Sequence, residues 1–172
     1  GIENRQVWQI RAFNEELLFA VTQPIGLFRS DDGGESWREV KSFASMPQAS
    51  RWCLPLTPPI AARARTIVVD EDDVQKIWVG VEVGGIVKTE DGGENWDMVL
   101  PGDNPDLHVL CAQPNDPDVL YASTGYGRLD GVADMVEGNA GVFRSDDRGS
   151  TWQYAWRGIT PRYSRPMCID QR

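Results

Sequence analysis

The chain has 172 residues, with 17 Lys and Arg against 26 Asp and Glu and a formal net charge of −9 at pH 7. This length is enough for one domain with a sizeable core. The acidic balance argues against nucleic acid as a partner, because such binding depends on cationic side chains that neutralise phosphates. No apolar run reaches the ~20 residues of a membrane-spanning helix, and no targeting segment is recognisable, so we expect a soluble protein of undetermined compartment.

Short apolar runs with turn residues between them recur along the chain and predict strands. In the first third they are VWQIRAF (7–13), LLFAVTQ (17–23), GLFR (26–29) and REVKSF (38–43). The middle third repeats the pattern with RTIVVD (65–70), IWVGVE (77–82), GIVK (85–88) and DMVL (97–100). The last third has HVLCAQP (108–114), VLYAST (119–124), GVFR (141–144) and QYAWRG (153–158). The apolar spacing of an amphipathic helix is absent throughout.

One motif follows the third run of each group. It reads SDDGGESW at 30–37, TEDGGENW at 89–96 and SDDRGSTW at 145–152. Four short strands per unit, repeated with a fixed turn motif, indicate the blades of a β-propeller. We therefore predict an all-β fold, a propeller fragment of about three four-stranded blades plus the first strand of a fourth. The expected blades span about 5–43, 63–100 and 106–158, and the fourth begins at about 162–170.

A closed propeller ring has ~4–8 blades, so three blades leave the ring incomplete. The sequence is compatible with two explanations. The chain is a fragment of a longer propeller, which we favour, or further copies of the chain complete the ring. The expected partners are accordingly the remaining blades or a second copy of the chain.

The S-x-D-x-G-x-[ST]-W box resembles the Asp-box, or bacterial neuraminidase repeat, of sialidases. Similar boxes occur in xyloglucan-degrading hydrolases, sortilin-type receptors and the photosystem II assembly factor. The phrases QPNDPDVLYAST and GVFRSDDRGSTW are similar to bacterial repeat proteins described as sialidase-like. The resemblance covers roughly residues 5–170 and implies a β-propeller.

The box residues have structural roles on chemical grounds. The Asp can accept hydrogen bonds from backbone N–H groups of its own turn, the Gly permits a left-handed backbone, and the Trp buries apolar area against the blade. These positions are Asp32, Gly34 and Trp37, then Asp91, Gly93 and Trp96, and finally Asp147, Gly149 and Trp152. The boxes lack the further ligands of a calcium loop, and the chain has a single His, so we expect neither a metal nor a cofactor.

The ends of the inner strands supply the predicted ligand-binding residues. Aligning the units places Arg65 opposite His108, and the same register gives Arg165 at the start of the last strand. Three such groups at the mouth of the central channel suggest an anionic ligand, such as a carboxylate sugar. The alternative is that each arginine pairs with a nearby acid. Trp52, in the long connection after the first unit, is a further candidate for ligand contact, because long loops on rigid scaffolds often bind ligands.

Catalysis is the second hypothesis. The sialidase resemblance implies an Arg-Ile-Pro motif, which the sequence lacks, and a Tyr nucleophile, for which Tyr163 beside Arg165 is the candidate. Ordinary glycosidases need two carboxylates ~5–9.5 Å apart, which Glu82 together with Asp130, Asp134 or Glu137 could supply. We favour a non-catalytic module that binds a carbohydrate, an anionic ligand or a protein. The alternative is a sialidase-like glycoside hydrolase whose other blades lie outside this chain.

Overall fold

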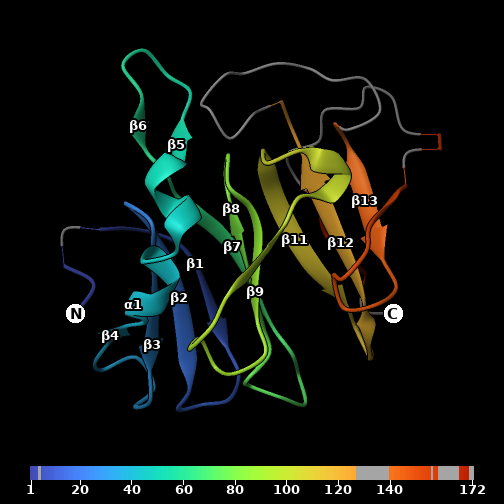
Figure 1. The fold of residues 1–172 in the computed structure, drawn as a ribbon. Coiled ribbons are helices and arrows are strands. Elements are labelled where there is room, and N and C mark those ends of the chain that lie inside the picture. Colours follow the sequence, from blue (N-terminus) through green and yellow to red (C-terminus); the bar gives the residue numbers. More distant parts are fainter. Residues whose placement is uncertain (4, 127–139, 156, 159–166, 171–172) are drawn as a thin grey trace.

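The computed structural model describes residues 1–3, 5–126, 140–155, 157–158 and 167–170. Within these residues the chain forms three four-stranded antiparallel sheets and one small hairpin (Figure 1). In each four-stranded sheet the strands follow one another in chain order. This meander is the arrangement of a propeller blade and confirms the predicted all-β fold.

The elements have the following bounds. The first sheet contains β1 (Gln6–Ala12), β2 (Leu18–Gln23), β3 (Gly26–Ser30) and β4 (Arg38–Glu39). The second contains β7 (Ala64–Val69), β8 (Ile77–Val81), β9 (Gly85–Thr89) and β10 (Asp97–Val99), and the third contains β11 (Leu107–Gln113), β12 (Asp116–Thr124), β13 (Val142–Ser145) and β14 (Gln153–Tyr154). Between the first two sheets lie α1 (Lys41–Ala44), η1 (Pro47–Arg51) and the hairpin of β5 (Cys53–Leu54) and β6 (Ile60–Ala61); η2 (Pro101–Asp103) precedes the third.

The expected start of a fourth blade falls largely outside the described residues. Residues 162–166 belong to that part, and residues 167–170 are described as neither helix nor strand. The Cys111 sulfur lies 3.9 Å from the Met167 carbonyl oxygen, so this short segment runs beside β11.

The first strand of each sheet is the innermost, and neighbouring inner strands are joined by hydrogen bonds. The Gln9 side-chain oxygen on β1 accepts the N–H of Ile67 on β7 at 2.8 Å. The Thr66 hydroxyl on β7 donates to the Leu110 carbonyl on β11 at 3.2 Å. The three sheets are therefore arranged around a common axis with β1, β7 and β11 beside it (Figure 1).

The core lies between the sheets. One apolar cluster joins the first and second sheets and includes Phe19, Leu27 and Val79, each at most 1% exposed. A second cluster joins the second and third sheets around Trp78 and Phe143. Every residue of β8 is buried, because the middle sheet is covered on both faces.

The three Asp boxes share one set of hydrogen bonds. Oδ1 of the box Asp accepts the backbone N–H four residues later, at 2.9 Å for Asp32, 2.9 Å for Asp91 and 2.7 Å for Asp147. These and other hydrogen bonds to the carboxylates lower the pKa of all three, to about 2 for Asp32 and Asp147. The three box tryptophans donate Nε1–H to the carbonyl of the box glycine three residues earlier, at 3.1, 3.2 and 3.1 Å.

Two of the boxes also join neighbouring sheets. The Gly93 carbonyl of the second box accepts the hydroxyl of Ser42 in α1, which follows the first sheet. The Arg148 carbonyl of the third box accepts Nε1–H of Trp78 on β8 at 3.0 Å. These boxes thus fix both their own turn and the contact with the preceding blade. Among the described residues, no helix is long and apolar enough to cross a membrane.

Candidate functional site at the channel mouth

Each inner strand has a β-bulge close to its start. The pairing register shifts between Val7 and Gln9 in β1, between Ala64 and Thr66 in β7, and between Leu107 and Val109 in β11. The bulged residues are Trp8, Arg65 and His108. A bulge re-aims its side chain relative to the regular alternation of a strand. The structure thus places Arg65 and His108 at equivalent positions, as the alignment predicted, with Trp8 as the third member.

Arg65 is paired with an acid, which is the alternative that the sequence left open. Its Nη1 lies 3.0 Å from Oε2 of Glu82, at the end of β8. Arg63 pairs with the same carboxylate through Nε, and through Nη2 at 2.8 Å from Oε1. The side chains of Arg63, Arg65 and Glu82 are 22%, 20% and 11% exposed, so the network is largely shielded from water.

Burial of the Glu82 carboxyl raises its pKa, but the guanidinium groups outweigh this effect. The hydrogen bond from Arg63 and the charges of Arg65 and Arg63 hold the pKa of Glu82 below its ordinary value. Glu82 is therefore ionised at neutral pH. It can accept hydrogen bonds, but it has no proton to donate.

Trp8 is the aromatic part of this site. The guanidinium carbon of Arg63 lies 4.3 Å from the centroid of an indole ring of Trp8, and that of Arg65 lies 5.9 Å away. These distances are typical of cation–π contacts. Trp8 remains 36% exposed, so part of the indole faces solvent beside the ion pairs.

His108 and Asp106 complete the cluster from the third sheet. His108 Nε2 lies 3.4 Å from Oδ1 of Asp106, and both residues are buried. Glu82, Asp106 and His108 each offer one potential metal-ligand atom, and these atoms lie within 4.8 Å of one another. A divalent cation there would be repelled by the guanidinium groups of Arg63 and Arg65 on Glu82. The arrangement suits an ion-pair network better than a metal site.

The other predicted site residues are placed differently. Trp52 is 5% exposed and packs in the core, with its ring centroid 6.5 Å from that of Phe43. Its indole supports the long connection, and its contact with a ligand stays a prediction. Asp130, Asp134, Glu137, Tyr163 and Arg165 lie outside the described residues.

Sequence reasoning missed Trp8, Arg63 and Asp106. Arg63 precedes Arg65 by two residues, the spacing that puts side chains on one face of a strand, so it could have been included. Trp8 could have been found by extending the alignment of inner strands to VWQIRAF. Asp106 lies just before β11, and the sequence carries no comparable signal for it.

A BNR/Asp-box repeat is recognised at residues 28–39 by its family model. The chain is 27% identical over 179 residues to the oligoxyloglucan-reducing end-specific xyloglucanase of Emericella nidulans, covering 94% of the chain and 20% of that protein. A probable enzyme of the same kind from Neosartorya fischeri is 26% identical over 178 residues, with the same coverage. The chain thus spans about a fifth of the length of these curated relatives.

Two solved structures have a similar fold. An ancestral GH74 enzyme superposes with a TM-score of 0.60 at 19% identity, covering 86% of this chain and 18% of that chain. YCF48 bound to D1 peptide superposes with a TM-score of 0.56 at 17% identity, covering 87% of this chain and 39% of that chain. Together with the repeat match, these similarities confirm the resemblance to Asp-box β-propeller proteins.

Proposed function

We propose that this chain is the part of a β-propeller that binds a carbohydrate at the channel mouth. The observation that carries the proposal is the partly exposed Trp8 indole beside the network of Arg63, Arg65 and Glu82. An indole offers an apolar face to the C–H groups of a sugar ring, and a few fixed polar groups provide orientation. The guanidinium groups can donate to sugar hydroxyls, and Glu82 can accept from them.

The charges at the mouth favour a neutral sugar. Arg63 and Arg65 both pair with Glu82, and the carboxylate of Asp106 lies in the same cluster beside His108, so little net positive charge is left for a carboxylate ligand. This differs from the anionic ligand that the sequence suggested, which becomes the alternative in the test below. The names of the curated relatives refer to xyloglucan oligosaccharides, which agrees with a sugar ligand.

Hydrolysis is the second candidate function. Carboxylate oxygens of Glu82 and Asp106 lie within 4.8 Å of each other, close to the ~5 Å separation of the carboxyl groups in retaining glycosidases. A general acid in such a pair needs a raised pKa, whereas the pKa of Glu82 is lowered. Both residues are also buried, with 8% of Glu82 and 5% of Asp106 exposed when backbone and side chain are taken together. The described residues therefore support binding better, and any hydrolytic residues would lie in other blades.

The test is calorimetric titration with a neutral xyloglucan oligosaccharide and with an oligogalacturonate of similar length. We expect the neutral sugar to bind more tightly than the oligogalacturonate. Trp8→Ala should lower the affinity for the neutral sugar about tenfold or more, since stacking on an indole contributes on the order of 1–3 kcal/mol. Ile10→Ala is the matched control, because Ile10 is 53% exposed on the same strand. Tighter and salt-dependent binding of the oligogalacturonate would support the anionic ligand instead, and binding unaffected by Trp8→Ala would refute the proposed site.

A further inference from the structure

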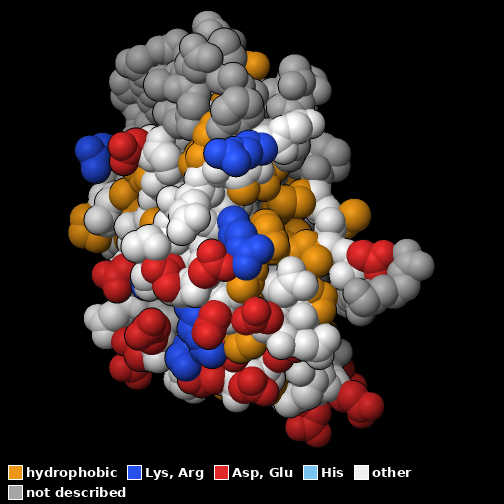
Figure 2. Space-filling model, turned by 90° about the vertical axis from the view of Figure 1, so that its right-hand side faces the viewer, with side chains coloured by type: hydrophobic (Ala, Val, Ile, Leu, Met, Phe, Trp, Pro, Cys, Tyr) orange, Lys and Arg blue, Asp and Glu red, His pale blue; other side chains and the backbone are white. Residues whose placement is uncertain are grey.

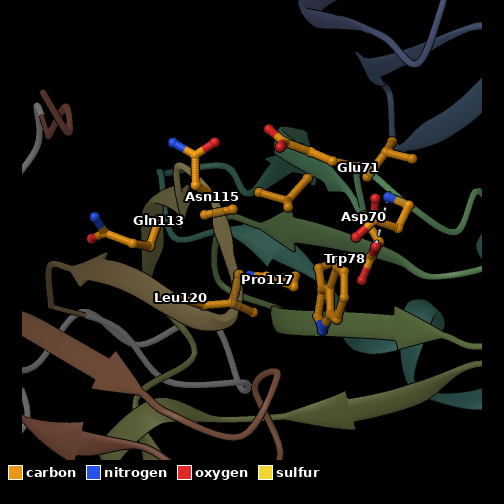
Figure 3. A pocket seen from close by; sticks show the side chains of 11 residues that line it. Asp70, Glu71, Trp78, Gln113, Asn115, Pro117 and Leu120 are labelled. Atoms are coloured by element: carbon orange, nitrogen blue, oxygen red, sulfur yellow. Dashed lines mark hydrogen bonds between the residues drawn. The ribbon is translucent and has the colours of Figure 1, made fainter. Parts of the chain in front are cut away.

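A cavity of about 260 Å³ lies between the second and third sheets, at the end of the molecule opposite the channel mouth. It is bounded by the β7–β8 turn on one side and the β11–β12 turn on the other (Figure 3). Its apolar lining comes mainly from Val68, Trp78, Ala112, Pro117 and Leu120. None of these residues belongs to the channel-mouth site.

The wall around Asp70 is held rigidly. Asp70 is 4% exposed, and its Oδ1 accepts the N–H groups of Asp72 and Asp73 at 3.0 and 3.2 Å. Its Oδ2 pairs with Nη1 of Arg148 at 2.7 Å, and the Arg148 carbonyl accepts Nε1–H of Trp78. Asp70 and Trp78 are thus engaged in joining the blades, and the cavity is preformed.

The rim carries polar groups that remain open to solvent. Glu71 and Asp72 are exposed carboxylates on the β7–β8 turn, and the amides of Gln113 and Asn115 lie across the cavity from Glu71 (Figure 3). Glu71 pairs with Arg11 at 3.8 Å, and the side chains of Glu71 and Arg11 are 62% and 44% exposed. Such a long, exposed ion pair contributes little free energy, so a ligand can readily take the place of Arg11 beside Glu71.

The surroundings add to this negative rim. Acidic side chains gather over the lower half of the face shown in Figure 2, at the end that carries the Asp boxes. The chain itself shows how this junction holds a cationic side chain, since Arg148 Nε pairs with Asp118 at 2.7 Å while its Nη1 pairs with Asp70. A cationic group is therefore the ligand chemistry that complements this end of the molecule.

We infer that this cavity binds a primary ammonium group on an alkyl stem, presented as a lysine side chain by a partner protein. The ammonium would donate to Glu71 and Asp72, which accept hydrogen bonds when ionised. The methylene groups of the stem would cover Val68 and Leu120, as long cationic side chains commonly bury their stems on apolar surface. An apolar interior with an acidic rim matches both parts of a lysine side chain.

The test uses the peptide acetyl-Gly-Lys-Gly-amide and its Nε-acetyllysine form, titrated into the 172-residue chain and followed by two-dimensional NMR. We expect weak binding of the lysine peptide and no binding of the acetylated one. The double variant Glu71→Gln, Asp72→Asn should weaken binding about fivefold to tenfold, the loss expected for two exposed charge contacts. Raising the salt concentration should weaken it further.

The matched control is the double variant Glu15→Gln, Glu16→Gln. Glu15 and Glu16 are exposed acids on the β1–β2 turn. Their substitution removes the same amount of charge as the first double variant, but at a position away from the cavity. Equal weakening by the two double variants would show that the peptide binds the acidic surface in general and would overturn the inference, as would equal binding of the acetylated peptide. Trp8→Ala should leave peptide binding unchanged, so the result is independent of the carbohydrate proposal.

Discussion

The guanidinium of Arg63 lies over the indole of Trp8, 4.3 Å from the ring centroid, although the two residues belong to different blades. The contact crosses the boundary between the first and second sheets at the channel mouth. The same guanidinium donates to both carboxylate oxygens of Glu82. The orientation of the exposed indole is thereby coupled to an ion pair within the second blade.

Glu82→Gln should reduce the stability of the chain. The substitution leaves Arg63 and Arg65 largely buried without their counter-charge, which costs about 1–3 kcal/mol of unfolding free energy. Urea denaturation followed by tryptophan fluorescence measures this loss. The control is Glu39→Gln, which breaks the more exposed pair between Arg5 and Glu39 and should cost less than about 1 kcal/mol. Equal losses in both variants would show that the channel-mouth network has no special stabilising role.

The pH dependence of stability should follow the carboxylates whose pKa is lowered in the folded state. The pKa of Glu82 is below its ordinary value, and the pKa of Asp32 and of Asp147 is about 2. Such groups stabilise the fold above the pKa of the unfolded chain, near 4, and this contribution is lost as the pH falls through the folded value. We expect the melting temperature to fall between pH 5 and pH 2. Asp147→Asn should flatten that fall, whereas an equally steep curve in the variant would exclude the box Asp as a cause.

The blade architecture could be predicted from the sequence because its signals are local. A period of two in each apolar run and a turn motif repeated at 30–37, 89–96 and 145–152 are visible without any long-range information. The hydrogen bonds within each box also follow from residue types at fixed spacing. Each of these hydrogen bonds joins residues that are only a few positions apart in the chain.

The channel-mouth site could be predicted only in part. The equivalence of Arg65 and His108 follows from the repeat, but the pairing of Arg65 with Glu82 depends on the bulge that re-aims its side chain. Trp8 was missed because a bulge breaks the alternation by which strand faces are assigned. Trp52 faces the core because η1 turns the chain immediately before it, and such a reversal leaves no periodic signal.

Gly93→Ala should destabilise the joint between the first two blades. Gly93 has a φ of +98°, where a side chain is strained, and an added Cβ would lie 2.9 Å from Cγ1 of Val40. Strain and close contact together should cost about 1–3 kcal/mol in unfolding free energy.

Asp91→Ala should also lower the melting temperature, because it removes the acceptor for Asn95 N–H. Neither variant should change carbohydrate affinity at temperatures where it stays folded, and loss of binding by a folded variant would show that the box is part of the ligand site.

The first inner strand, β1, exposes an apolar side that the other two inner strands bury. Ile10, Ile67 and Leu110 are equivalent by register, each being the second residue after the bulge, yet Ile10 is 53% exposed whereas Ile67 is 1% and Leu110 is 2% exposed. Both buried residues lie against a preceding sheet. The face around Ile10 has the apolar composition of a blade interface, but none of the sheets that the structure describes covers it. Val7, 43% exposed on the same strand, extends this apolar area.

We therefore expect the 172-residue chain to self-associate in isolation, because apolar area of this kind is rarely left open to water. Sedimentation velocity over a range of concentrations measures the association. Ile10→Lys should shift the equilibrium towards the monomer, since it places a charge in the contact. The matched control Arg11→Lys keeps the charge at an exposed neighbouring position and should leave association unchanged. A wild-type chain that is monomeric at every concentration would show that this face needs no partner.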